Sequence, residues 1–295
     1  LNSYSLNLMF ETSLLFKTFF VFGSQLSLVF GICYLFIFLV RKATLSGESF
    51  FGATFEIKYN DKGEIDLFAA EQEEYDNWRR EINIELNEAF DNRFKEGRDY
   101  PSEKKEITKR IAEKEKEMMN PLNQITQILL WVWLISLVTC AVISTTDYSI
   151  FIKMLILTIT SASFGPILAV NMLNMDENDG LRILKLTVFL AFLAGIIGMY
   201  SGIDFSSLGL ALIGPLGVLI IWNIAGIFRN FTRWSRRIMG IFGSFVFIGF
   251  LLFDFHRLMK ASEYGINDWE TAFTIGFSIY LDVINLLLEL LEAFG

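Results

Sequence analysis

Seven apolar stretches of roughly twenty residues or more are the feature that most constrains the fold of this 295-residue chain. A transmembrane helix needs about 20 consecutive apolar residues to cross about 30 Å of hydrocarbon. Hydrophobic residues make up 53% of the sequence, and several of the stretches carry very few charges. The stretches are Leu14–Val40, Leu122–Ser144, Ile150–Leu173, Leu181–Tyr200, Phe205–Phe228, Ile238–Leu258 and Thr271–Phe294. The sequence therefore predicts an all-α membrane protein with seven transmembrane helices.

The connections among the last six stretches are short, from four to twelve residues. Connections of this length make neighbouring helices run antiparallel and pack into one bundle. Because the chain begins at Leu1 rather than at methionine, we expect it to be processed or truncated.

A charged region, Arg41–Pro121, is inserted between the first two predicted spans and is expected to be soluble. Phe55–Tyr59 and Glu64–Phe68 alternate polar and apolar residues on either side of Asn60–Gly63. Alternation around a turn of this composition is typical of a β-hairpin. The sequence thus predicts a small hairpin at the start of the insertion.

Two helices are expected in the rest of the insertion. Apolar residues recur every three or four positions over Glu71–Gly97, which indicates an amphipathic helix. Ser102 can cap a second helix, rich in Glu and Lys, that runs through Met118. The simplest interpretation is a solvated cap that docks on its own bundle or on a neighbouring subunit.

Composition argues against several classes of function. The chain has one histidine and lacks a CxxC pair, a glycine-rich phosphate loop and a Gly-x-Ser-x-Gly elbow, so we expect no enzyme, no catalytic residue and no resident cofactor. The net charge is −8, and no basic arm is present, which disfavours a nucleic-acid partner. The expected partners are the lipid bilayer and, through residues 41–121, other subunits of a membrane complex.

Two carboxylates, Asp254 and Asp282, lie inside the last two predicted spans. An ionised group that faces lipid is costly, so such residues usually turn inward and mark an ion or proton path. Two facing carboxylates repel each other when both are ionised, and the pair can relieve this by sharing a proton or binding a cation. This pattern indicates a pH-sensitive switch or a divalent cation site.

A stripe of polar residues follows one side of the last span. Its members are Ser278, Asp282, Asn285, Glu289 and Glu292. At about 100° per residue they fall within an arc of about 80°. We therefore expect this helix at the centre of the bundle, where the stripe lines a wet cavity or makes polar contacts. The alternative is that the polar groups only hold helices together.

Contact between Asp254 and Asp282 depends on where the last hairpin turns. The turn signals Gly265–Asn267 place its apex near residue 266, which offsets the two carboxylates by about four residues, or about 6 Å. Arg257, three residues from Asp254, is a candidate ion-pair partner. His256 is expected to point away from Asp254 and to be solvated or interfacial.

Three stretches resemble the transmembrane Bax inhibitor motif family, whose members are seven-helix calcium leak proteins. They are Phe253-Asp-Phe-His-Arg-Leu258, Ile279-Tyr-Leu-Asp-Val-Ile-Asn-Leu286 and Ile203-Asp-Phe-Ser-Ser-Leu208, of which the second is the most specific. The resemblance implies a central last helix and a paired-aspartate pH sensor that gates a path for cations, mainly calcium. It assigns that pair to Asp254 and Asp282.

Two features depart from the family pattern. Its compact form has only a short turn after the first helix, so residues 41–121 have no counterpart. Bacterial members carry an arginine at the end of the second helix that can pair with the aspartates, whereas Leu122–Ser144 contains no basic residue. Lys153, just beyond this span, is the candidate substitute.

The distribution of basic residues predicts the orientation in the membrane. On the side of the first loop lie Arg41, Lys42, Arg182, Lys185, Arg229, Arg233, Arg236 and Arg237, and on the other side lie Lys17, Lys153, Arg257 and Lys260. By the positive-inside rule the insertion faces the cytoplasm or the matrix, opposite to the usual family topology. The sequence is compatible with a mitochondrial inner membrane or a bacterial cytoplasmic membrane.

Two hypotheses for function follow. The first is a pH-sensitive cation leak or sensor, mainly for calcium, that works through Asp254 and Asp282. The second is a non-conducting scaffold or regulatory subunit of a larger membrane complex, which docks through residues 41–121.

Overall fold

The structure is a computed structural model that describes residues 13–53, 55–59, 65–68, 109, 121–146, 148–175, 177–228 and 232–294. The helices predicted over residues 71–97 and 102–118 lie outside this set, apart from Lys109, and so does the turn predicted over residues 60–63.

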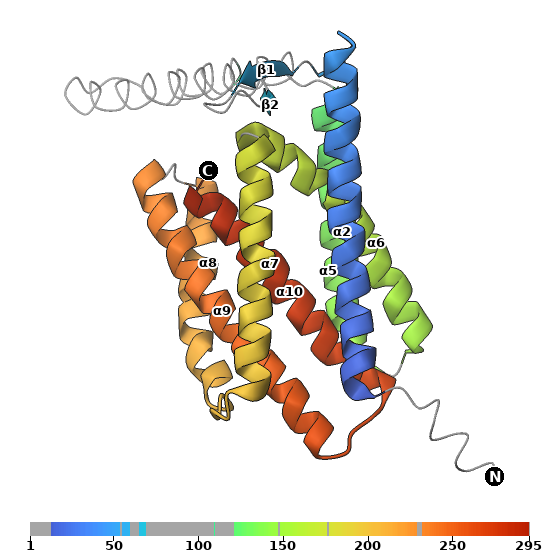
Figure 1. The fold of residues 1–295 in the computed structure, drawn as a ribbon, viewed down its shortest axis with the longest axis vertical. Coiled ribbons are helices and arrows are strands. Elements are labelled where there is room, and N and C mark those ends of the chain that lie inside the picture. The colour runs from blue at the N-terminus through green and yellow to red at the C-terminus, as the bar shows by residue number, and fades with distance from the viewer. Residues whose placement is uncertain are drawn as a thin grey trace. The chain divides into compact units, whose positions relative to one another are not determined.

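Within the described residues, seven helices are long and apolar enough to cross a membrane, which confirms the predicted number of spans. They are α2 (Leu14–Leu45), α5 (Pro121–Ser144), α6 (Ile150–Met175), α7 (Glu177–Tyr200), α8 (Leu208–Phe228), α9 (Arg233–Glu263) and α10 (Trp269–Phe294), shown in Figure 1.

Helix α9 is longer than its apolar stretch by five residues at each end, which corrects the predicted bounds Ile238–Leu258. The helix begins after Thr232, whose hydroxyl accepts a hydrogen bond from the Ser235 backbone N–H at 3.2 Å. It ends at Glu263, and Gly265, two residues further on, adopts a φ of 74° that favours glycine and donates its N–H to Ser262 O. Counting apolar residues misses these ends because capping, not hydropathy, sets them.

The chain divides into two compact units. The first comprises residues up to Ile32, Val132–Gly165 and Asn178–Gly295, and the second comprises Cys33–Trp131 and Pro166–Glu177. The first unit holds α7, α8, α9 and α10 almost completely, together with parts of α2, α5 and α6.

In the second unit, strands β1 (Glu56–Tyr59) and β2 (Ile65–Phe68) pair antiparallel. Glu56 lies opposite Phe68, and Tyr59 lies opposite Ile65. This pairing confirms the predicted hairpin.

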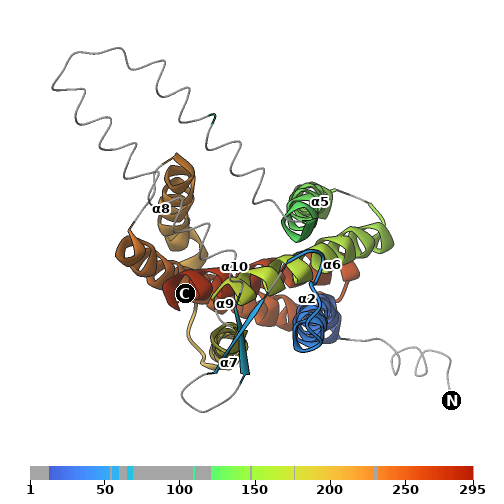
Figure 2. The same ribbon diagram turned by 90° about the horizontal axis from the view of Figure 1, so that it is seen from above.

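In the first unit, α10 is the central helix, as predicted. Of its most apolar 18-residue stretch, 72% is buried, compared with 50% for α9 and 28% for α7. It packs along α9, approaches α2 at Gly276 and contacts α6 where Ser161 Oγ lies 3.2 Å from Tyr280 Oη. Figure 2 shows α10 among these neighbours. Residues along α10 are therefore removed from lipid on most sides.

Candidate functional site

Asp254 of α9 and Asp282 of α10 lie next to each other in the interior of the first unit. Their exposed fractions are 5% and 9%, and their side chains are close enough to share a hydrogen bond. The two helices run antiparallel around the turn Tyr264–Asp268, and the two side chains meet despite the offset predicted along the helix axes. The structure thus brings the two embedded carboxyl groups together.

No basic group in the described part of the chain neutralises this pair directly. Among the described residues, neither aspartate forms an ion pair, and Asp282 Oδ2 receives no hydrogen bond. Arg257 attracts Asp254 electrostatically, but it is exposed and lies outside ion-pair distance. Removing an unpaired carboxylate from water is costly. The arrangement can therefore take up a proton or a cation.

The other members of the polar stripe lie along the same helix at different depths. Glu289 is buried, and Ser278, Asn285 and Glu292 are half-buried. Ser278 Oγ donates to Thr274 O of its own helix at 3.2 Å. In the part of the chain that the structure describes, no three His, Cys, Asp or Glu side chains converge on a metal-sized site. The acidic residues of the stripe are thus spaced along α10 and do not form a cluster.

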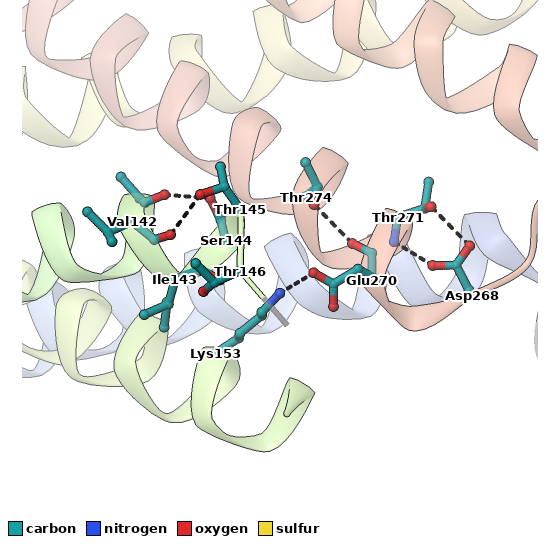
Figure 3. Close-up of polar contacts among 11 residues, drawn as sticks. Val142, Ile143, Ser144, Thr145, Thr146, Lys153, Asp268, Glu270, Thr271 and Thr274 are labelled. Atoms are coloured by element: carbon teal, nitrogen blue, oxygen red, sulfur yellow. Dashed lines mark hydrogen bonds and ion pairs between the residues drawn. The ribbon is translucent and has the colours of Figure 1, made fainter. Parts of the chain in front are cut away.

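Lys153 has a partner other than the aspartates, which corrects its expected role. Its ammonium group forms an ion pair with Glu270 in the first turn of α10 (Figure 3). Glu270 precedes Asp282 by twelve residues, or about 18 Å along a helix. Lys153 is fully buried, and its Nζ atom lies 5.9 Å from the centre of the Phe273 ring. The lysine therefore fixes the start of α10.

The start of α10 is held by two further interactions. Asp268 caps the helix by accepting hydrogen bonds from Thr271 N at 2.7 Å and Thr271 Oγ1 at 3.0 Å (Figure 3). The backbone hydrogen bond from Thr271 is the main reason that the pKa of Asp268 is lowered. From α2, Lys17 Nζ donates to Asn267 O at 2.8 Å and lies over the Trp269 ring. Helices α2 and α6 thus both hold this end of α10.

His256 is buried, whereas the sequence predicted a solvated or interfacial residue. Its Nε2 atom lies 3.2 Å from Oδ1 of Asp204, in the connection between α7 and α8, and Phe205 packs edge-on against its ring. Hydrogen bonds from Ser206 are the first cause of the lowered pKa of Asp204. The sequence feature that could have pointed to this contact is the segment Ile203–Leu208, which contains Asp204 and Phe205 and carries part of the family resemblance.

Known proteins with similar sequences include two plant proteins and a viral one. Protein LIFEGUARD 4 of Arabidopsis thaliana is 35% identical over 112 residues, which is 38% of this chain and 41% of that protein. Protein LIFEGUARD 1 of the same plant is 36% identical over 30% of this chain and 36% of its own length. The Golgi anti-apoptotic protein of vaccinia virus (strain Lister) is 37% identical over 30% of this chain and 35% of its own length.

The matched segments therefore span about two fifths or less of these relatives. A family model covers more of the chain. Residues 116–295, well over half of the sequence, match the family described as inhibitor of apoptosis-promoting Bax1. The described residues form seven helices long and apolar enough to cross a membrane. Together with a family match of this extent, they show that the chain belongs to the Bax inhibitor family of multi-pass membrane proteins.

Proposed function

We propose that this protein is a pH-sensitive cation leak or sensor, mainly for calcium, and that Asp254 and Asp282 form its ion site. One observation carries the proposal. Two buried carboxyl groups lie side by side, and no described basic residue forms an ion pair with either.

Electrostatics explains why such a pair responds to both protons and cations. Two like charges at hydrogen-bond distance repel far more strongly in a protein interior than in water. A shared proton removes one of the charges, and a bound cation offsets both. Protons and cations therefore compete for the same oxygen atoms, which makes cation binding depend on pH.

The site suits a passing calcium ion better than a resident one. Calcium takes six to eight oxygen ligands in proteins. The pair offers at most four carboxylate oxygens, so backbone carbonyl groups and water would have to complete the shell. Incomplete coordination favours rapid release, as conduction requires.

The broader biological role is proposed from the family. The family description and the name of the vaccinia relative both concern inhibition of apoptosis. We propose the same role for this chain, with cation release across its membrane as the physical activity.

Calcium binding to the full chain, purified in mild detergent, tests the ion site. We expect radioactive calcium binding to be greater at about pH 8 than at about pH 6, because protons compete for the carboxylates. Asp282→Asn and Asp254→Asn should each lose this difference. Asp179→Asn is the matched control, since Asp179 is an exposed carboxylate that pairs with Arg182.

Acidic residues that all these proteins retain contribute equally to their calcium binding, so only the differences between variants count. Equal calcium binding by Asp282→Asn and the parent at both pH values would exclude the ion site. If the parent also copurified with a stoichiometric partner, that outcome would support a scaffold that docks through residues 41–121.

A further inference from the structure

A third carboxyl group, Glu289, is buried at a close contact between α9 and α10. It lies seven residues beyond Asp282, or about 10 Å along the helix, and is 9% exposed. A Cβ atom added to Gly243 of α9 would collide with Glu289 Oε2. One added to Gly240 would lie 2.7 Å from both Glu289 O and Ala293 N. The carboxyl group of Glu289 therefore packs directly against the backbone of α9 at Gly243.

Nothing in the described part of the chain neutralises this carboxyl group. It has no hydrogen bond or ion pair there, and Ser244, which follows Gly243, donates its hydroxyl to Gly240 O at 2.8 Å. The charge that acts on Glu289 is that of Glu292, one turn further along its own helix, and it is repulsive. On α9, Arg236 is exposed and acts on Glu292.

An ionised carboxylate cannot remain in this position at low cost. It would be desolvated by the α9 backbone, repelled by Glu292 and left without a donor. The protonated form is neutral and fits the contact between the helices. Half-buried Glu292 lies one turn further along α10, and its partial exposure gives a proton a route toward Glu289.

We propose that Glu289 is a second protonation site, whose protonated side chain closes α9 against α10 at Gly240 and Gly243 and whose ionisation separates the two helices there. This switch is distinct from the aspartate pair and does not rest on the proposed function. It predicts a movement at this end of the two helices as pH rises.

A distance measurement between two spin labels tests this switch. Trp234 at the start of α9 and Phe294 at the end of α10 are both exposed, so Trp234→Cys and Phe294→Cys place labels at the moving end. The native thiols, Cys33 and Cys140, are buried, and labelling of the unsubstituted protein measures their background. The labelled full chain is compared at about pH 5 and about pH 9.

We expect a longer distance between the labels at the higher pH in the doubly labelled parent. Glu289→Gln, and Glu289→Met as a second neutral variant, should keep the short distance at both pH values. Glu292→Gln is the matched control and should keep the shift, because it leaves the carboxyl group of Glu289 in place against Gly243. Asp282→Asn should also keep the shift, which separates this switch from the ion site.

An unchanged distance in the parent between the two pH values would overturn the proposal. So would a shift that persists in both neutral Glu289 variants, or one that disappears in Asp282→Asn. None of these results depends on calcium binding, so this proposal and the ion site can fail separately.

Discussion

Lys153 of α6 and Glu270 of α10 form an ion pair in which the lysine is fully buried and the glutamate is half exposed (Figure 3). The two residues are 117 positions apart in the sequence. Together with the contacts of Lys17, this pair fixes the end of α10 that lies away from Glu289. The start of α10 is thus held by Lys153 and Lys17, and near its other end the carboxyl group of Glu289 packs against α9.

Glu270→Gln should destabilise the protein because it leaves the ammonium group of Lys153 buried without an opposite charge. Breaking a fully buried pair costs about 3–5 kcal/mol, and access of water to Glu270 reduces the expected loss to about 1–3 kcal/mol. Thermal unfolding in detergent measures the effect. Glu263→Gln is the control, since its pair with Lys260 is exposed on both sides and should cost less than about 1 kcal/mol. Equal shifts in the two variants would contradict the anchoring role.

Gly240→Ala should disturb the packing of α9 on α10. The new methyl group would lie 2.7 Å from backbone atoms of Glu289 and Ala293, which cannot move aside as a flexible side chain can. Overpacking of this kind typically costs about 1–3 kcal/mol. Gly217→Ala on α8 is the control, because nothing lies within 4 Å of its added Cβ atom and alanine is the better helix former. A similar melting temperature for both variants would argue against close packing at Gly240.

The sequence predicts those features of the structure that depend on residues close together in the chain. Apolar runs predict the seven spans, and the polar stripe predicts that α10 is central, because both depend on neighbours in the chain. The predicted ends of α9 were wrong because capping at Thr232 and the backbone geometry at Gly265 determine where the helix begins and ends. The partners of Lys153 and His256 were missed because each lies on a distant segment. Contact between Asp254 and Asp282 stayed open for the same reason, since it depends on how two helices cross.

Asp268→Ala should remove the cap of α10 and cost about 1 kcal/mol. The pKa of Asp268 is lowered by its hydrogen bonds from Thr271. Its contribution is therefore complete above the ordinary pKa of an aspartate, about 3.9, and is lost as the pH falls through the lower value of the folded protein. Comparing the unfolding of the parent and the variant between about pH 7 and about pH 3 measures this loss.

Asp268→Ser separates the two parts of that prediction. A serine hydroxyl can accept the same hydrogen bond at the start of the helix but does not titrate in this range. This variant should keep most of the stability at neutral pH and should lack the acid-dependent part. A cap contribution that did not change with pH in the parent would show that the charge of Asp268 is unimportant.

Calcium release from vesicles tests the central claim most directly. The full chain is reconstituted into liposomes that enclose a calcium-sensitive dye, and flux is compared at about pH 6 and about pH 8 for the parent, Asp254→Asn, Asp282→Asn and Asp179→Asn. We expect flux through the parent and through Asp179→Asn to depend on pH, and this dependence to be lost in both variants of the aspartate pair. Absence of flux from the parent at both pH values, or unchanged flux in Asp282→Asn, would contradict the account.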